Sequence, residues 1–312
     1  MEKLTICIPT YNREGPLIKN VNLLLEYIDE YNLQERITIV ISDNCSENYL
    51  KVKEKYSSNP NIKLYQHKET VSAEKNFVTV INLSETDWVM LLGDDDYIDK
   101  RYLYLVMKYI EDKTISTIIP NFYVVDGNGN KINDGKCRDE ITDDAIYEKG
   151  SYEMMYKGHQ MSGLVFRKKG LIESYYKNVR PNLYPQIYFV GYNISRGKCI
   201  HITRYPLKNT VIEKKNFNYD IDMLMDHILL NIHGLPINYA QKIELSKFII
   251  KKETMGRLGH IRSWTHPIKM IRKLCKYDES INIRVYLIYR FILSYFQRFH
   301  HLIHKFLYRK DR

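Results

Sequence analysis

The sequence predicts an α/β fold with a mainly parallel sheet, an antiparallel extension and a helical C-terminal region. Through residue 112, short apolar segments alternate with longer segments of helical periodicity, which is typical of βαβ units. The turn-forming run Asp126–Asn130 then indicates a change to antiparallel structure. From about residue 220 onward, the spacing of apolar residues is mostly helical.

The alternating part contains four short strand-like runs, of which the first, second and fourth are apolar enough to be buried in a sheet. In chain order they are Leu4–Ile8, Ile37–Ile41, Ile62–Gln66 and Trp88–Leu92. The segments between them have the apolar spacing of amphipathic helices and are Pro16–Tyr31, Glu47–Tyr56 and Ser72–Leu83. After residue 112, the next expected strands are Thr117–Val125 and Ser162–Arg167.

The composition fits a folded chain with a sizeable core, since 44% of the 312 residues are hydrophobic and 27% are charged. No run reaches the roughly 18 uncharged apolar residues that a membrane-spanning helix needs. Met1 leads into the first apolar segment without the layout of a signal peptide, so we expect a cytoplasmic protein. The five scattered cysteines argue against a disulfide framework or a structural zinc site.

The net charge of +10 is concentrated in the last part of the chain. Residues 251–312 carry fifteen lysines and arginines against four acidic residues, a net charge of +11, and the first 250 residues sum to −1. Such a distribution points to an anionic partner for the basic region only. We expect a main domain at residues 1–215 and a helical, basic region at 216–312.

Polar segments follow three of the predicted strands, and the carboxyl ends of parallel strands are where α/β sheets bind ligands. These segments are Pro9–Arg13, Ser42–Asn48 and Asp94–Asp96. Three consecutive aspartates repel one another unless donors or a hard divalent cation hold them, which favours a metal site. Capping of the helix that begins near Asp99 is the alternative, although it needs only one or two aspartates.

Together these segments resemble the successive signatures of family 2 glycosyltransferases with the GT-A (Rossmann-like) fold. The resemblance covers about residues 4–200, is strongest over 4–112, and is nearest to abequosyltransferase-like enzymes of bacterial surface-polysaccharide synthesis. It implies transfer of a sugar from a nucleotide diphosphate sugar, of UDP or TDP type, with Mn²⁺ or Mg²⁺ as cofactor. A glycan or a polyprenyl-linked sugar is the implied acceptor, and inversion is the usual outcome in this family.

The resemblance also assigns roles to residues. It implies a nucleotide-sugar site that contains Pro9, Thr10, Tyr11, Arg13, Asp43, Lys75, Asp94 and Asp95. Asp43 would accept a hydrogen bond from the imide N–H of a uracil or thymine ring, although a turn that closes its own loop is the alternative. Lys75 would reach the diphosphate or remain a solvated helix residue.

For the metal, the resemblance implies Asp96 as the main ligand. Asp94 would bind the ion through water or hold the ribose hydroxyls. A metal at this point would stabilise the leaving diphosphate as a Lewis acid.

The general base that inversion requires has no clear candidate in the sequence. Many relatives carry an acidic pair near the segment where this chain has Pro185-Gln186. His159 and Asp222 are candidates elsewhere, although a surface or capping role is the more common one for such residues. A non-catalytic nucleotide-sugar-binding or assembly protein on the same fold is therefore the alternative function. A nicotinamide-dependent enzyme is disfavoured because no G-x-G-x-x-G follows the first strand.

The sequence predicts an amphipathic helix near 284–308 within the basic region. Its apolar stripe consists of Val285, Tyr289, Ile292, Phe296, Phe299, Ile303 and Phe306, and basic residues such as Arg290 fall on the opposite face. The pattern predicts attachment to the anionic inner face of the cell membrane. Packing on its own domain or on another subunit is the alternative, so an oligomer is also compatible. No recognition motif accompanies the charge, so nucleic acid is not an expected partner.

Overall fold

The structure is a computed structural model that describes residues 1–132, 135–211, 221–257, 281–290, 292–293 and 296. The side chains of residues 221–226 and 253–257 lie outside this description. The chain divides into two compact units, Met1–Phe217 and Asn218–Arg312.

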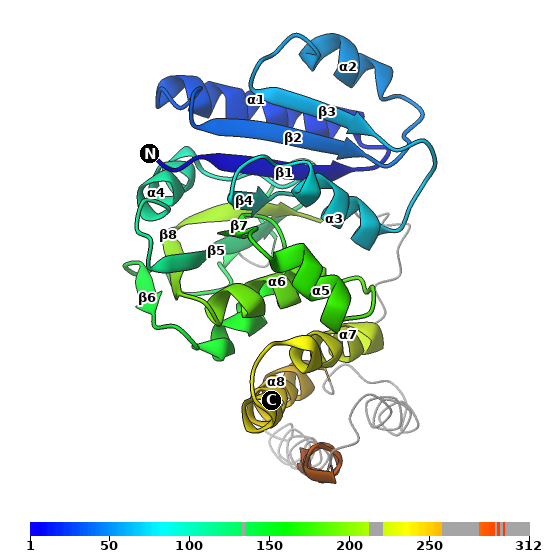
Figure 1. Cartoon of the computed structure of the whole chain (residues 1–312), viewed down its shortest axis with the longest axis vertical. Helices are drawn as coiled ribbons and strands as arrows, with labels where there is room; N and C mark the ends of the chain where they lie inside the picture. The colour runs from blue at the N-terminus through cyan, green and yellow to red at the C-terminus, as the bar shows by residue number, and fades with distance from the viewer. Residues whose placement is uncertain (133–134, 212–220, 258–280, 291, 294–295, 297–312) are drawn as a thin grey trace, which may run out of the picture. The chain divides into compact units, whose positions relative to one another are not determined.

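The first unit is built on one eight-stranded sheet with the order β3-β2-β1-β4-β7-β5-β8-β6 (Figure 1). Its first four strands are β1 (Leu4–Thr10), β2 (Ile37–Asp43), β3 (Ile62–Gln66) and β4 (Trp88–Leu91). All neighbouring pairs among them are parallel, which confirms the predicted βαβ order. β1 and β2 each extend two residues beyond the predicted apolar runs, so their last residues are the polar Thr10 and Asp43.

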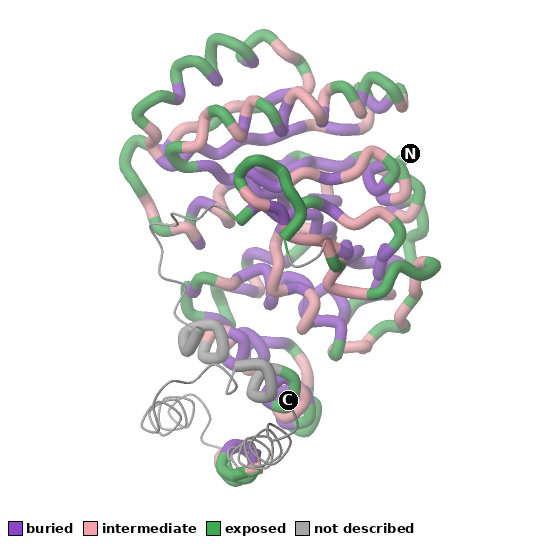
Figure 2. Tube along the Cα trace, turned by 180° about the vertical axis from the view of Figure 1, so that it is seen from behind, coloured by how far each residue is buried: buried purple, intermediate pink, exposed green. Residues whose placement is uncertain are grey.

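Three helices cover one face of this sheet and enclose the main core. They are α1 (Glu14–Glu30), α2 (Leu50–Tyr56) and α4 (Lys100–Tyr109). Their apolar sides pack on alternate strand residues such as Ile6, Ile39 and Met90. In Figure 2 the central strands appear as a continuous buried layer, with exposed residues on the outer sides of the helices. Burial of these alternate side chains is the main contribution to the stability of the unit.

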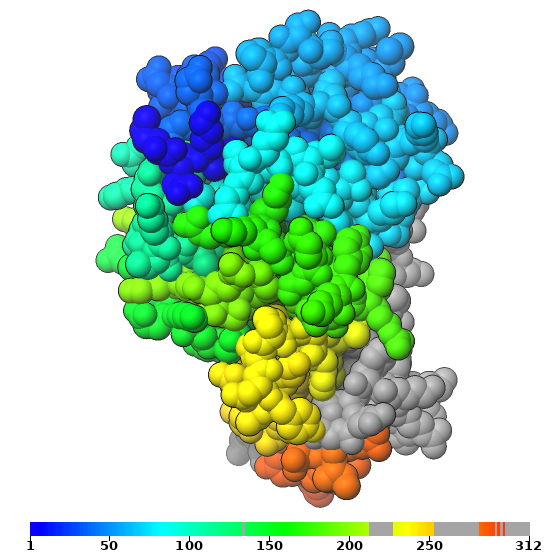
Figure 3. Space-filling view, viewed as in Figure 1, coloured from blue at the N-terminus to red at the C-terminus, as the bar shows by residue number. Residues whose placement is uncertain are grey.

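The opposite face of the sheet carries α3 (Ala73–Asn82), α5 (Leu171–Asn178) and α6 (Pro185–Ile194). α3 packs on β1 and β2, where Cys7 Sγ lies 3.5 Å from the carbonyl oxygen of Val80. α6 contacts β5 and β7 and also α5. Figure 3 shows the α3 and α5 segments, in cyan and green, on the same side of the unit.

The second half of the sheet contains antiparallel pairs, as the sequence predicts. β7 (Leu164–Arg167) is antiparallel to both β4 and β5 (Ile115–Val125). β8 (Lys198–Thr210) pairs in parallel with β5 along most of its length, and the short β6 (Ala145–Tyr147) is antiparallel to β8. The sequence does not predict β8, because polar residues such as His201 and Thr203 interrupt its apolar pattern.

The second unit contains α7 (Ile221–Gly234), α8 (Tyr239–Arg257) and a helical segment at residues 281–290. The described members of the predicted stripe are exposed: Val285 at 60%, Tyr289 at 53%, Ile292 at 48% and Phe296 at 69%. Arg290 is instead buried and lies 3.5 Å from the carbonyl oxygen of Lys251 on α8. Residues 297–308 of the predicted helix lie outside the described residues. None of the described helices is long and apolar enough to span a membrane.

Candidate nucleotide and metal site

Three loops that follow parallel strands meet at one edge of the sheet. Thr10 at the end of β1 is in register with Asp43 at the end of β2. The segment Gly93–Asp96 follows β4 on the other side of β1, and Thr10 Oγ1 donates to Asp94 Oδ2 over 2.7 Å. The strand register therefore brings the three segments singled out in the sequence into one site.

One guanidinium bridges two of the aspartates. Arg13 Nη1 lies 3.1 Å from Asp94 Oδ1 and 2.8 Å from Asp95 Oδ2. Burial raises the pKa of Asp94 to about 6, although Arg13 opposes this shift and the Asp95 charge adds to it. Arg13 pairs with two carboxylates, and Asp96 lies beside them. The loop would therefore carry a net negative charge if all three aspartates were ionised.

Asp96 is held by donors from two other parts of the unit. Its Oδ1 accepts from the backbone N–H of Thr210 over 2.8 Å, and its Oδ2 accepts from Ser162 Oγ. Gln160 Nε2 lies 3.5 Å from the same Oδ2. Burial, followed by the nearby Asp95 charge, raises the pKa of Asp96 to about 7. The ionised form is thus costly without a further cation.

A cavity of about 300 Å³ lies between the loops that follow β1 and β2, and Thr10, Arg13, Asp43 and Tyr49 are among its lining residues. Asp43 is fully buried, and its Oδ2 accepts from Ser46 N–H over 2.8 Å and from Gln66 Nε2 over 3.0 Å. Its Oδ1 accepts no hydrogen bond from any described residue. A buried carboxylate oxygen without a donor is costly, so Asp43, which lines this cavity, suits a ligand with an N–H group.

The two loops around this cavity hold each other in place. The backbone N–H of Asn12 donates to Ser46 Oγ over 2.7 Å, and the N–H of Glu47 donates to Asn12 Oδ1 over 3.3 Å. Asn12 and Cys45 have positive φ angles, of 52° and 64°. Asn adopts this left-handed conformation readily, whereas for Cys it is uncommon and persists only where the surroundings impose it.

Carboxylates are the candidate ligands for a divalent cation at this edge of the sheet. Among the described residues, no group of three or more His, Cys, Asp and Glu side chains is arranged to hold a metal ion. A cation bound together with a nucleotide needs only one or two carboxylates, because phosphates and water supply its other ligands. The buried carboxylates of Asp94–Asp96, with one guanidinium as countercharge, fit an ion shared in this way.

The other predicted nucleotide residues lie around this edge with different exposure. Pro9 is buried inside β1, Tyr11 is 41% exposed at the start of the first loop, and Lys75 is exposed in the first turn of α3. The neighbouring Asn76 holds α3 in place, since its Oδ1 accepts from Ser42 Oγ over 2.7 Å. Pro9, Tyr11 and Lys75 remain predicted ligands of the nucleotide sugar.

The two candidate bases are at different places. His159 ends the 3₁₀-helix η2 (Tyr152–His159), and its Nδ1 lies 2.9 Å from the carbonyl oxygen of Tyr156. Gln186 Nε2 donates to the carbonyl oxygen of His159 over 2.9 Å, so α6 and this helix end are in contact. Asp222 belongs to α7, and its side chain lies outside the described residues.

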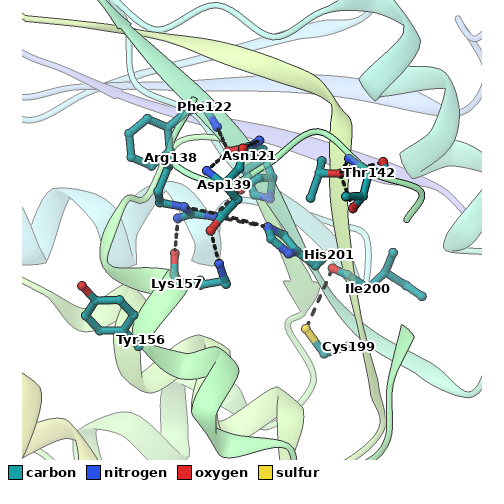
Figure 4. Close-up of polar contacts among 12 residues, drawn as sticks. Asn121, Phe122, Arg138, Asp139, Thr142, Tyr156, Lys157, Cys199, Ile200 and His201 are labelled. Carbon is teal, nitrogen blue, oxygen red and sulfur yellow. Dashed lines mark hydrogen bonds and ion pairs between the residues drawn. The ribbon is translucent and has the colours of Figure 1, made fainter. Parts of the chain in front are cut away.

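A cluster of charged side chains fixes η2, whose C-terminal end leads into Gln160 and Ser162. Figure 4 shows Arg138, Lys157 and His201 converging on Asp139. Arg138 Nε lies 2.8 Å and His201 Nε2 lies 3.2 Å from Asp139 Oδ2, and Lys157 pairs with Oδ1. Burial opposes ionisation of Asp139, but hydrogen bonds from His201 and Lys157 and the Arg138 charge hold its pKa below the usual range. The cluster therefore anchors the segment that presents donors to Asp96.

Sequence reasoning missed the residues that support the aspartates. Asn20, Ser162 and Thr210 all contact the segment Gly93–Asp96, yet each is a single polar residue within or next to an apolar element. The sequence offered a weak signal for Asn20 only, because its amide occupies a position that the helical pattern of α1 buries. A Cβ at Gly93 would lie 3.0 Å from both Asp96 Oδ2 and Ser162 Oγ, so the glycine permits this close approach.

Known proteins are similar to the part of the chain that contains Thr10, Asp43 and Asp94–Asp96. The model of the family described as Glycosyl transferase family 2 matches residues 5–176. Abequosyltransferase RfbV of Salmonella typhimurium is 27% identical over 113 residues, which are 35% of this chain and 33% of that protein. Poly(ribitol-phosphate) beta-N-acetylglucosaminyltransferase TarS of Staphylococcus aureus is 25% identical over 130 residues, 41% of this chain and 22% of that protein. The chain thus aligns with only a minor part of either relative.

Solved structures show the same fold. Residues 1–349 of S. aureus TarS in complex with UDP-GlcNAc match with a TM-score of 0.68 and 17% identity, covering 88% of this chain and 80% of that one. The mannosyltransferase PcManGT from Pyrobaculum calidifontis, in complex with GDP-Man and Mn²⁺, matches with a TM-score of 0.52 and 12% identity, covering 95% and 87%. These likenesses confirm the fold class predicted from the sequence.

Proposed function

The chain belongs to glycosyl transferase family 2, whose model matches more than half of it, and on that premise we propose that it is a glycosyltransferase. Its donor is a nucleoside diphosphate sugar with a uracil or thymine base. Its acceptor is a glycan or a lipid-linked sugar of cell-surface polysaccharide synthesis. The reaction depends on Mn²⁺ or Mg²⁺ and inverts the anomeric centre.

The observation that carries the proposal is the unpaired oxygen of Asp43. Asp43 lines the cavity between the β1 and β2 loops, and its buried Oδ1 receives no hydrogen bond from the described residues. The imide N–H of uracil or thymine would supply the missing donor, whereas the corresponding ring nitrogen of cytosine is an acceptor. The TarS complexes with UDP-GlcNAc and UDP support this choice of base by analogy.

The loop Gly93–Asp96 is the proposed diphosphate and metal site. Asp96 would be the main metal ligand, and Asp94 would bind the ion through water or hold the ribose hydroxyls. Arg13 would bind the diphosphate, because it lines the nucleoside cavity and its guanidinium pairs with Asp94 and Asp95. A divalent cation supplies Lewis-acid stabilisation of the leaving group when it is bound. The Mn²⁺ complex of PcManGT is consistent with this proposal.

The general base stays unassigned in this proposal. Gln186 is 3% exposed and lies in the segment where the family resemblance implies an acidic residue. An amide does not accept a proton near neutral pH, so Gln186 is not the base. This difference keeps a nucleotide-sugar-binding protein without transfer activity as the second candidate function.

Nucleotide binding, measured as a change in melting temperature, tests whether the protein has either of the two candidate functions. We expect UDP or TDP to raise the melting temperature, and Mn²⁺ to enlarge the shift. Slow release of the nucleoside diphosphate from the matching nucleotide sugar would favour the enzyme, whereas binding without release would favour the second candidate. Absence of any nucleotide-dependent shift would refute both.

The C-terminal region is proposed to attach the protein to the anionic inner face of the cell membrane. Four described residues of its apolar stripe are between 48% and 69% exposed, and Ile281 and Ile288 are exposed beside them. The net charge of +11 over residues 251–312 complements anionic lipid. Burial of the stripe in the interface and attraction of the basic residues would act together.

A further inference from the structure

The segment Gly93–Asp96 is a tight turn that its own backbone closes poorly. The N–H of Asp96 lies 3.4 Å from the carbonyl oxygen of Gly93, which is long for a hydrogen bond. When they are ionised, the three carboxylates of this turn repel one another, and their burial strengthens this repulsion. Something outside the turn must therefore hold it.

A single side chain of α1 spans the two ends of this turn. Asn20 Nδ2 donates to the carbonyl oxygen of Gly93 over 2.9 Å and to the carbonyl oxygen of Asp96 over 2.8 Å. Asn20 is 1% exposed. Both partners are carbonyl oxygens, so the amide nitrogen must face the turn, and its two N–H groups match the two acceptors.

The same helix also begins at the nucleoside loop. Arg13 immediately precedes α1 and pairs with Asp94 and Asp95, and Asn20 lies about two turns further along the helix. Movement of α1 would shift both the guanidinium and the ends of the turn. The helix thus connects the proposed base-binding loop to the proposed metal-binding loop.

We infer that Asn20 is a positioning residue that holds the turn Gly93–Asp96 in the conformation in which its carboxylates can share a metal ion with a diphosphate. Asn20 touches neither metal nor nucleotide and acts only through the two carbonyl oxygens. The inference rests on the proposed function for its metal and diphosphate, but the ordering of the turn itself does not depend on either ligand.

Asn20→Leu tests the inference because leucine has a similar volume and donates no hydrogen bond. Asn22→Leu is the matched control, since Asn22 lies on the same helix and accepts from Tyr56 OH over 2.8 Å. With divalent metal removed by a chelator, we expect amide hydrogen exchange across residues 92–98 to be faster in Asn20→Leu than in the unmodified protein. Asn22→Leu should leave this exchange unchanged. Exchange across β2 should be unchanged in both variants.

The second readout is the factor by which Mn²⁺ tightens the binding of UDP, measured by calorimetry with the full chain. We expect this factor to fall about tenfold in Asn20→Leu, as loss of two hydrogen bonds implies, while UDP affinity in chelator is retained. If Asn20→Leu does not fold, Asn20→Ser keeps a smaller polar side chain that cannot span both carbonyl oxygens, and the same two measurements apply.

Unchanged exchange in the turn together with an unchanged Mn²⁺ factor would overturn the role of Asn20. Equal effects of Asn20→Leu and Asn22→Leu would reduce it to a general contribution to the stability of α1. Failure of the unmodified chain to bind UDP would instead overturn the proposed function, and the exchange measurement would still decide whether Asn20 orders the turn.

Discussion

Replacement of Asp43 by asparagine should change which base the protein prefers. The two donors that hold Asp43 Oδ2 are the backbone N–H of Ser46 and Gln66 Nε2. Gln66 cannot easily reverse its amide, because its Oε1 accepts from Lys53 Nζ over 2.7 Å. In Asp43→Asn the single amide oxygen must therefore face these donors, and the new NH₂ group takes the place of Oδ1.

The size of the change follows from the hydrogen bonds exchanged. Uracil would lose a bond to a charged acceptor, worth about 1.5–3 kcal/mol, so UDP affinity should fall by roughly 10- to 150-fold. Cytosine presents an acceptor at the same ring position and would gain a neutral bond of about 0.5–1.5 kcal/mol. The preference for UDP over CDP should thus decrease by about 30- to 2,000-fold.

Calorimetric titrations of UDP and CDP into the unmodified protein, Asp43→Asn and Asp43→Ala measure this preference. Asp43→Ala should weaken UDP without any gain for CDP, because alanine neither donates nor accepts. Melting temperatures check that each variant folds. A UDP-to-CDP ratio that stays the same in Asp43→Asn would refute the assignment of Asp43 to the base and leave it as a residue that closes its own loop.

Four other predictions concern the metal, pH, the buried charge cluster and the membrane. Asp96→Ala should abolish Mn²⁺-dependent transfer while UDP binding in chelator survives, and full activity of this variant would remove the proposed metal site. Because the folded-state pKa values of Asp94 and Asp96 are raised to about 6 and 7, their contribution to stability is complete below about pH 3.9 and is lost as pH rises through those values. The melting temperature of the metal-free protein should therefore fall between about pH 4 and 7 more steeply than that of Asp96→Asn, and equal slopes would contradict this origin. Asp139→Asn should destabilise the first unit by about 3 kcal/mol in urea unfolding, since it leaves two cations without their countercharge, and a loss under about 0.5 kcal/mol would mean that the cluster is not structural. Truncation before Asp278 should abolish sedimentation with anionic vesicles while transfer to a soluble acceptor survives, and serine at Tyr289, Ile292 and Phe296 should weaken sedimentation without a change in charge; vesicle binding that is absent at low salt would exclude the membrane.

The sequence was most informative where local chemistry and fold agree. The strands up to Leu91 were predicted nearly residue by residue, because buried parallel strands are short apolar runs between amphipathic helices. The loops after β1, β2 and β4 were predicted to meet, since parallel strands place their carboxyl ends at one edge. These inferences needed only patterns within about ten residues.

What the sequence did not predict depends on contacts between distant segments. Thr210 reaches Asp96 across more than a hundred residues, and β8 carries too many polar residues to be recognised alone. Asn20 looks like one more polar residue of an amphipathic helix, and only the structure shows that it faces the aspartate turn. Arg290 was predicted on the basic face opposite the apolar stripe, and it is buried beside α8, because the helix presents that side to its own unit.

The most direct test of the central claim is a screen of nucleotide sugars for release of the nucleoside diphosphate, with Mn²⁺ and then with excess chelator. We predict release from a UDP- or TDP-sugar, loss of that release in chelator, and its loss in Asp43→Ala at low donor concentration. Release only from cytidine or adenosine donors, or turnover that Asp43→Ala and chelator leave undiminished, would contradict the account.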